Sequence, residues 1–202
     1  MKPMTEREGL SAERPRLVLV SASPRRRWLL EKLGVPFEVL AADIEERAAI
    51  GEAPDHFAQR MADEKAAAAL VSRPAAWLLA ADTVVAIGGE ALGKPCDARQ
   101  AEEMLARLAG SWHTVYTGVT LCRPGGVAVE RRVVATRVSF RELVPAEIIA
   151  YIASGEPFDR AGAYAIQGEG AHLIDHVEGS YTNVIGLPLP EVTAWLRAWR
   201  LL

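Results

Sequence analysis

The 202-residue sequence predicts an α/β fold built on a mixed β-sheet. In the first half of the chain, short apolar runs typical of buried strands alternate with segments of helical apolar spacing, which indicates strands joined by helices. Two longer strand-like runs then follow each other across a Pro-Gly-Gly turn at residues 124–126, which is the pattern of an antiparallel hairpin. The length of the chain favours a single domain.

The first strand is expected to lead directly into the first helix. Residues 16–22 form a short apolar run, and Pro24 has the fixed φ angle that suits the first turn of a helix. Gly34 is expected to end this helix. The apolar face of the helix should comprise Trp28, Leu29, Leu30 and Leu33.

The later elements depend on the same kinds of signal. Asp97, followed three residues later by Gln100, has the spacing of a helix capping box. Residues 155–186 are rich in glycine, with short apolar runs between the glycines. Further strands are predicted at residues 37–42, 77–87, 113–122 and 127–140, and further helices at residues 54–71, 97–108, 145–153 and 190–202.

Composition and charge exclude several classes of protein. With 23 basic and 26 acidic residues, the formal net charge of −3 argues against binding to polymeric nucleic acid. No apolar run approaches the roughly 18 residues of a membrane-spanning helix. Residues 1–15 lack the apolar stretch of a signal peptide and are expected to form a flexible arm before one domain at residues 16–202. Cys96 and Cys122 are too few for a disulfide scaffold, so a reducing, cytoplasmic location is expected.

A run of serine and arginine stands where the first strand should meet the first helix. Residues 21–27 have the sequence Ser-Ala-Ser-Pro-Arg-Arg-Arg. The free N–H groups and the positive dipole end of a helix N-terminus favour an anion, and arginine binds phosphate through two parallel hydrogen bonds. We therefore predict a phosphate site here; the alternative is a solvated basic turn.

An aspartate interrupts the longest predicted buried strand. Asp82 and Thr83 stand among the apolar residues of segment 77–87, and valines follow them. A carboxylate in apolar surroundings is costly unless it is paired, binds a metal or faces a cleft. Asp82 is therefore a candidate general base or metal ligand, and the alternative is an aspartate that caps a turn at a strand end.

Two other patterns are expected to be incidental. Residues 88–94 have the Gly-x-x-x-x-Gly-Lys spacing of a P-loop, but Pro95 follows where that motif requires Ser or Thr. Lys94 stays a candidate phosphate contact. His172 and His176 have the i, i+4 spacing of a zinc pair on a helix, but their segment is strand-like, so ordinary polar histidines are expected.

A series of short motifs follows in order along the chain. They are SASPRR at residues 21–26, DIEE at 43–46, EKA at 64–66, ADTVV at 81–85, GKP at 93–95, SGEP at 154–157, AGAYAIQG at 161–168 and GSYTNVIGLP at 179–188. Each is weak alone, but the ordered series resembles the Maf family of nucleoside triphosphate pyrophosphatases over about residues 16–200. Arg160 and Ala165 depart from this pattern, because many relatives have lysine and glycine there.

The resemblance implies a reaction and an architecture. It implies hydrolysis of a nucleoside triphosphate between the α and β phosphates, with a divalent cation, Mg²⁺ or Mn²⁺. It also implies a curved mixed sheet flanked by helices, with two lobes around a central cleft, similar to the HAM1-type inosine triphosphatases. The Asp-Thr and Ile-Gln-Gly forms of the motifs resemble the branch that acts on dTTP and UTP, and the branch acting on 7-methyl-GTP differs at the positions of Thr83 and Gln167.

The resemblance and the charge of the substrate together assign roles to residues. Asp82 matches the family's proton acceptor, and substrate choice follows positions matching Arg25, Thr83 and Gln167. Stabilising the charge on a triphosphate calls for positioned cations and a metal held by oxygen ligands. The candidate substrate contacts are Ser23, Arg25, Arg26, Lys65, Thr83, Lys94 and Gln167, and the candidate metal ligands are Glu45 and Asp82.

Two alternatives for the function and one for assembly stay open at this point. The chain is either the pyrimidine-directed enzyme, a purine-directed one that removes 7-methyl-GTP or ITP, or a non-catalytic nucleotide-binding regulator of cell division. A regulator should have a damaged catalytic set, whereas the motif residues are all present. Leu196 and Trp199 on the last predicted helix either pack internally or contribute to a homodimer.

Overall fold

The computed structural model describes residues 16–202, and the predicted arm at residues 1–15 lies outside the described residues. A seven-stranded sheet has the order β2-β1-β3-β5-β6-β7, with β4 paired to β3. β1 is parallel to both β2 and β3. The pairs β3–β5, β5–β6 and β6–β7 are antiparallel. The strands are β1 Leu17–Val20, β2 Phe37–Leu40, β3 Trp77–Ile87, β4 Glu90–Leu92, β5 Trp112–Cys122, β6 Ala128–Phe140 and β7 Ile174–Glu178.

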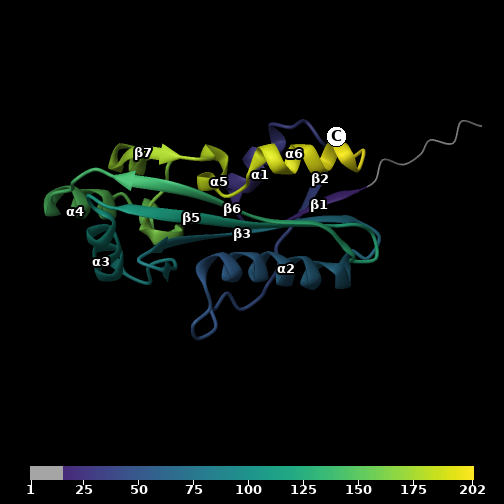
Figure 1. Cartoon of the computed structure of the whole chain (residues 1–202), viewed down its shortest axis with the longest axis horizontal. Coiled ribbons are helices and arrows are strands. Elements are labelled where there is room, and N and C mark those ends of the chain that lie inside the picture. Colours follow the sequence, from purple (N-terminus) through teal and green to yellow (C-terminus); the bar gives the residue numbers. More distant parts are fainter. Residues whose placement is uncertain (1–15) are drawn as a thin grey trace, which may run out of the picture.

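Helices cover both faces of this sheet (Figure 1). α2 lies along one face, while α1, α5 and α6 lie on the other, and α3 and α4 gather at the far end of the long strands. The helices are α1 Pro24–Glu31, α2 Pro54–Ser72, α3 Ala98–Leu108, α4 Pro145–Ala153, α5 Tyr181–Ile185 and α6 Leu189–Ala198, with 3₁₀ turns at Glu156–Asp159, Ala161–Ala163 and Glu169–Leu173. The predicted mixed α/β fold is confirmed.

The strand that carries Asp82 lacks a neighbour along part of one edge. β5 pairs with β3 along nearly its whole length. On the opposite edge, β1 reaches only to Ala80, and the pairing of β4 begins at Val85. Residues 81–84 therefore have a strand neighbour on one side only among the described strands, and Asp82 and Thr83 lie in this gap.

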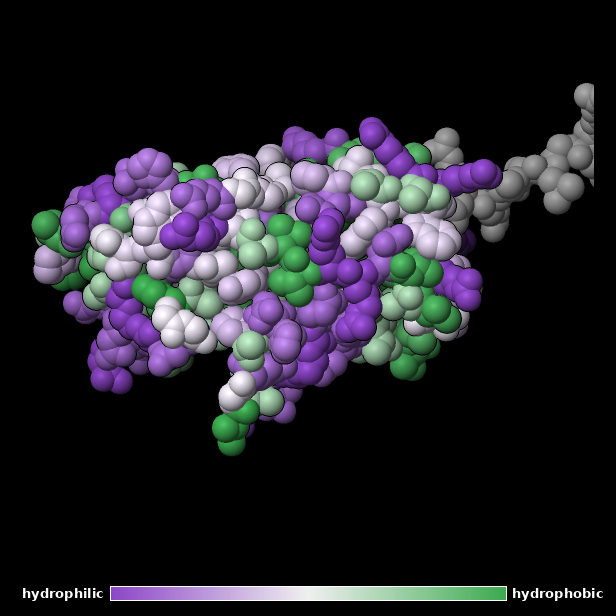
Figure 2. Space-filling view, viewed as in Figure 1, coloured by the Kyte–Doolittle hydropathy of each residue, from purple (hydrophilic) through white to green (hydrophobic). Residues whose placement is uncertain are grey.

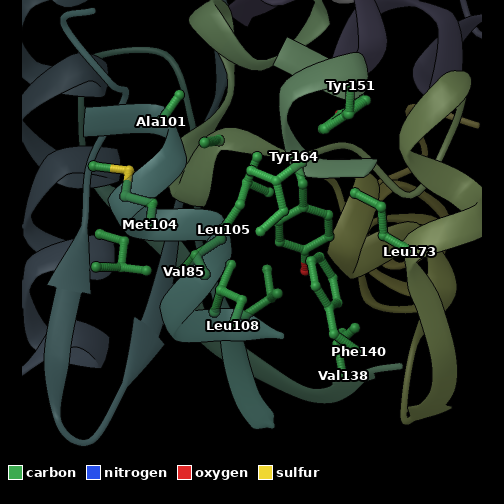
Figure 3. Close-up of a cluster of buried hydrophobic side chains, with 14 residues drawn as sticks. Val85, Ala101, Met104, Leu105, Leu108, Val138, Phe140, Tyr151, Tyr164 and Leu173 are labelled. Atoms are coloured by element: carbon green, nitrogen blue, oxygen red, sulfur yellow. The ribbon is translucent and has the colours of Figure 1, made fainter. Parts of the chain in front are cut away.

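The buried core is divided into three clusters. One packs α1 and α6 against the sheet, and a second packs α2 against its other face. The third fills the far end around α3 and α4, where Tyr164, Phe140 and Leu105 meet (Figure 3). Val85 belongs to the third cluster while Ala80 and Ala81 belong to the other two, so the gap in β3 lies where the two ends of the molecule meet.

α2 packs very close to the sheet. Its buried residues recur at helical spacing, and most of them are alanines. They are Ala58, Met61, Ala62, Lys65, Ala66 and Ala69. A Cβ atom added to Gly118 of β5 would lie 2.4 Å from the backbone oxygen of Ala58, so only glycine fits beneath this turn of the helix. The outward surface of α2 is hydrophilic along its first turns, whereas its last turns expose Ala67, Ala68 and Val71 to solvent (Figure 2).

Several details of the elements differ from the sequence-based expectations. Trp28 is 43% exposed and lies beneath the Lys32 ammonium group, because the short α1 turns Arg26, Leu29 and Leu30 inward instead. The Asp97 side chain caps α3 as predicted, but the Gln100 side chain accepts from the backbone N–H of Cys96. The three-residue strand β4 was too short to predict.

The C-terminal helix packs on its own chain. Leu196 is fully buried, and the Trp199 ring packs against Trp77 with ring centroids 5.4 Å apart. These side chains therefore have internal partners, and a homodimer stays a prediction. No helix among residues 16–202 is long and apolar enough to span a membrane.

Replacing Gly118 should destabilise the fold. In Gly118→Ala the new methyl group meets the α2 backbone, and we expect a loss of about 1–3 kcal/mol in the free energy of unfolding. Gly93→Ala is the matched control, because a Cβ there has nothing within 4 Å. Urea denaturation of both variants measures the difference, and equal stabilities would show that α2 does not press on β5 at this point.

His113 should make the protein sensitive to acid. Burial lowers the pKa of His113 from 6.5 to about 4, and its Nε2 lies 2.7 Å from the Tyr164 hydroxyl. Between these two pH values the unfolded chain binds a proton that the native state does not, so stability is full above pH 6.5 and falls as the pH drops toward 4.

His113→Gln keeps a polar partner for Tyr164 but cannot titrate. Between pH 6.5 and about pH 4 we expect the free energy of unfolding of the wild type to fall by up to about 3 kcal/mol, and that of the variant to fall by less. Denaturant titrations at neutral pH and at about pH 5 measure this difference. Equal losses in the two proteins would assign the acid sensitivity to other groups.

Candidate active site

A cavity opens at the gap in β3, between the end of β1 and the glycine-rich segment after α4. Its walls include residues from both ends of the molecule, so the predicted cleft is present. Glu45 is exposed and does not line the cavity; its neighbour Glu46 does. The other predicted site residues all line it: Ser23, Arg25, Arg26, Lys65, Asp82, Thr83, Lys94 and Gln167.

Asp82 is held by a lysine from α2. Lys65 Nζ lies 2.6 Å from Asp82 Oδ1 and 2.5 Å from Glu46 Oε1, so one ammonium group joins two carboxylates. Lys65 and Asp82 are 6% and 7% exposed. Asp82 shares a sheet face with Ala80, which packs toward α2, and this places it opposite the lysine on the buried stripe of the helix.

Burial and charge act in opposite directions on these carboxylates. Burial raises the pKa of Asp82, although Lys65 and Arg26 oppose the shift. Burial also acts to raise the pKa of Glu46, but the Lys65 hydrogen bond and the nearby cations together lower it. Asp82 therefore binds a proton more readily than an ordinary aspartate, which suits a general base, whereas Glu46 stays ionised.

The buried side chain of Arg26 forms hydrogen bonds with three separate segments of the chain. Its Nε donates to the backbone oxygen of Gly186 at 2.8 Å, Nη1 to Ser21 Oγ at 3.2 Å and Nη2 to Thr83 Oγ1 at 2.9 Å. These bonds join α1 to β3 and to the end of α5. Of the three consecutive arginines, Arg27 pairs with Glu31 on the surface, whereas Arg25 and Arg26 both line the cavity. Arg26 is buried and its guanidinium group is engaged by the three internal hydrogen bonds.

The two serines shape the turn before α1. The Ser23 hydroxyl caps the helix by accepting from the Arg26 backbone N–H, and Ser21 Oγ accepts from the Ser23 backbone N–H. The predicted helix start at Pro24 is confirmed, and the structure adds that Ser23 is the N-cap. The cavity wall here is therefore the N-terminal turn of α1, with Arg25 and the internally bonded Arg26.

Thr83 belongs to a polar chain on the other face of the sheet. Its hydroxyl lies 3.0 Å from Thr117 Oγ1, which donates to the backbone oxygen of Asn183 at 3.0 Å. The fully buried Asn183 donates in turn to Val115 O. Sequence reasoning missed Thr117 and Asn183, because a threonine in a strand and an asparagine in a glycine-rich stretch of sequence are both common in structural roles.

The opposite wall comes from the glycine-rich segment. Gln167 is half-buried, and its side chain forms no hydrogen bond with the rest of the described chain. Tyr164 also lines the cavity and packs edge-on against Phe140 in the core, as Figure 3 shows. Sequence reasoning missed Asp159 as a lining residue and noted Arg160 only as a departure from the family pattern.

No ready-made metal cage is present among residues 16–202. No group of three or more His, Cys, Asp or Glu side chains there could hold a metal ion. His172 lies in a 3₁₀ turn and His176 in β7, so they do not form the helical zinc pair. Asp82 and Glu46 nevertheless suit Mg²⁺, which is usually bound through one or two carboxylates and substrate phosphates.

Comparison with known proteins identifies the family. The family described as "Maf-like protein" matches residues 16–199, which is almost the whole described chain. The chain belongs to the Maf family. The resemblance found in the ordered motifs is thereby confirmed.

Curated relatives in the Maf family have a common name. A protein of Myxococcus xanthus (strain DK1622) named dTTP/UTP pyrophosphatase is 54% identical, over 93% of this chain and 94% of the relative. A relative with the same name in Anaeromyxobacter dehalogenans (strain 2CP-C) is 51% identical, over 91% of this chain and 93% of its own length. Another, in Geobacter sulfurreducens, is 47% identical, over 92% of this chain and 97% of its own length. The solved structure titled "Structure of a HAM1 protein from Coxiella burnetii" is a more distant likeness, with a TM-score of 0.48 and 14% identity over 91% of this chain and 99% of that one.

Exchanging Arg26 for lysine tests its structural role. A single ammonium group cannot reach Ser21, Thr83 and Gly186 together, so we expect Arg26→Lys to lose about 2 kcal/mol or more of stability. The matched control Arg27→Lys changes an exposed residue in the same helix and should change stability by less than about 0.5 kcal/mol. Thermal unfolding of both proteins compares them; a stable Arg26→Lys protein with weakened nucleotide binding would instead make Arg26 a direct phosphate ligand.

Proposed function

We propose that this Maf protein hydrolyses dTTP and UTP to the monophosphate and pyrophosphate, as the names of its relatives suggest. The observation that carries the proposal is the position of Asp82, a buried carboxylate held by Lys65 at the edge of a cavity with basic side chains. A regulator without activity would not need a costly buried carboxylate at this place.

The chemistry follows from charge. Arg25 and Lys94 neutralise the phosphates, and Lys65 keeps Asp82 in place and favours its ionised form. Asp82 takes a proton from the attacking water as the water oxygen bonds to phosphorus. The anhydride bond between the α and β phosphates breaks, and its electron pair leaves with pyrophosphate.

A divalent cation completes the charge balance in this proposal. The family resemblance implies one, and Asp82 and Glu46 are the carboxylates that would hold it together with phosphate oxygens. Glu46 takes the place expected for Glu45, because only Glu46 lines the cavity. Such a cation supplies Lewis-acid stabilisation of the phosphate charge.

Substrate choice is assigned to the opposite wall. The Gln167 side-chain amide has both a donor and an acceptor, which suits the edge of a pyrimidine base, and it has no competing internal partner among the described residues. Thr83 is fixed by Arg26 and Thr117 at the other side of the gap. A cytoplasmic location fits a nucleotide-pool enzyme and, like the homodimer, stays a prediction.

Replacing Asp82 should abolish turnover. We expect Asp82→Asn to lower kcat for dTTP by about 100-fold or more, since an amide cannot accept the proton. Asp175→Asn, which changes an exposed aspartate on β7, is the control for charge. Pyrophosphate release measures the rate, and an Asp82→Asn enzyme within about tenfold of wild type would exclude Asp82 as the base.

A substrate panel separates the pyrimidine from the purine hypothesis. With Mg²⁺ or Mn²⁺ we expect turnover of dTTP and UTP and little of 7-methyl-GTP or ITP, and chelation of the metal should stop the reaction. Turnover of the purine nucleotides alone would overturn the substrate assignment.

A further inference from the structure

Arg160 has unused hydrogen-bonding capacity in the cavity wall. Its Nε and Nη1 atoms are buried and have no hydrogen-bond partner. The residue lines the cavity, and 19% of its side chain is exposed. Buried donors without hydrogen-bond partners are rare and costly in native proteins. A ligand that accepts hydrogen bonds from this guanidinium group would remove that cost.

One carboxylate lies between Arg160 and Arg25. Asp159 Oδ1 is 2.5 Å from Arg160 Nη1, and Oδ2 is 3.5 Å from Arg25 Nη1. The contact to Arg160 is an ion pair without hydrogen-bond geometry, and the contact to Arg25 is long. Since Arg25 lies on α1 and Asp159 in the turn after α4, this carboxylate joins the two walls of the cavity.

Other acidic groups nearby are already engaged. Glu156 Oε2 accepts from the backbone N–H groups of Glu169 and Gly170 at 2.8 and 3.2 Å, so Glu156 serves the fold of its own segment. The Asp159 side chain is 64% exposed and accepts no backbone hydrogen bond in the described chain. Asp159 is therefore free to move away when a stronger anion arrives.

We propose that Arg160 is a phosphate-binding residue and that Asp159 is its resting counterion, which a phosphate group of the nucleotide displaces from between Arg160 and Arg25. This inference rests on the proposed function, because it assumes a phosphate-bearing ligand in the cavity. A phosphate group has more oxygens and more charge than a carboxylate, so it can accept well-aligned bonds from two guanidinium groups. Arginine at this position presents its Nε–H and Nη–H donors in one plane and can form two parallel hydrogen bonds to a phosphate group, whereas lysine offers a single ammonium group.

Binding of inorganic pyrophosphate tests the displacement without requiring turnover. Calorimetry should show that Asp159→Asn binds pyrophosphate about two- to fivefold more tightly than wild type, because the competing carboxylate is gone. Glu103→Gln is the matched control: it removes the same charge from the exposed Arg99–Glu103 pair on α3. The inference fails if Asp159→Asn binds no more tightly than Glu103→Gln.

The arginine is tested in the same way. Arg160→Gln should weaken pyrophosphate binding by roughly tenfold or more, and Arg160→Lys by less, whereas Arg99→Gln should weaken it little. If Arg160→Gln does not fold, as judged by thermal unfolding, Arg160→Lys decides. Unchanged binding in Arg160→Lys and Arg160→Gln would overturn the assignment.

The two proposals fail in different ways. If wild type hydrolyses dTTP but the Asp159 and Arg160 variants bind pyrophosphate like their controls, only the displacement is wrong. If wild type hydrolyses neither dTTP nor UTP while Asp159→Asn and Arg160→Gln shift pyrophosphate binding as expected, the phosphate site stands and the pyrimidine triphosphate activity is wrong.

Discussion

The ion pair between Lys65 and Asp82 is the constraint on which the site depends. Two charges are taken out of water between α2 and β3, and each would be very costly without the other. The pair can form only because α2 lies so close to the sheet, and this closeness requires Gly118 and the alanine-rich stripe of the helix. The packing of small residues therefore determines where the carboxylate proposed as the general base lies.

The interrupted edge of β3 gives this pair access to a ligand. A continuous partner strand would satisfy residues 81–84 and close the cleft, whereas β1 stops before them and β4 starts after them. Arg26 then joins the segments around the opening, so that the gap is framed by fixed elements. The cavity is thus a consequence of strand lengths.

Much of this was predictable from the sequence, and what was missed has physical reasons. Asp82 stood out because a carboxylate in an apolar strand has few explanations. The acidic run at residues 43–46 has no regular spacing, so it could not decide between Glu45 and Glu46. Likewise, three consecutive arginines do not reveal which one faces the core, and Arg26 proved to be largely a scaffold residue.

The alternation of side chains along β3 separates the proposed general base, Asp82, from Thr83, a proposed selectivity residue. Asp82 and Thr83 are adjacent in the chain but point to opposite faces, one toward α2 and the other toward α1 and α5. A substitution at Thr83 removes a hydrogen-bond partner of Arg26 and of Thr117 but no partner of Lys65. Under the roles proposed for Asp82 and Thr83, nucleotide preference can change during evolution, or by redesign, without a change at the proposed general base.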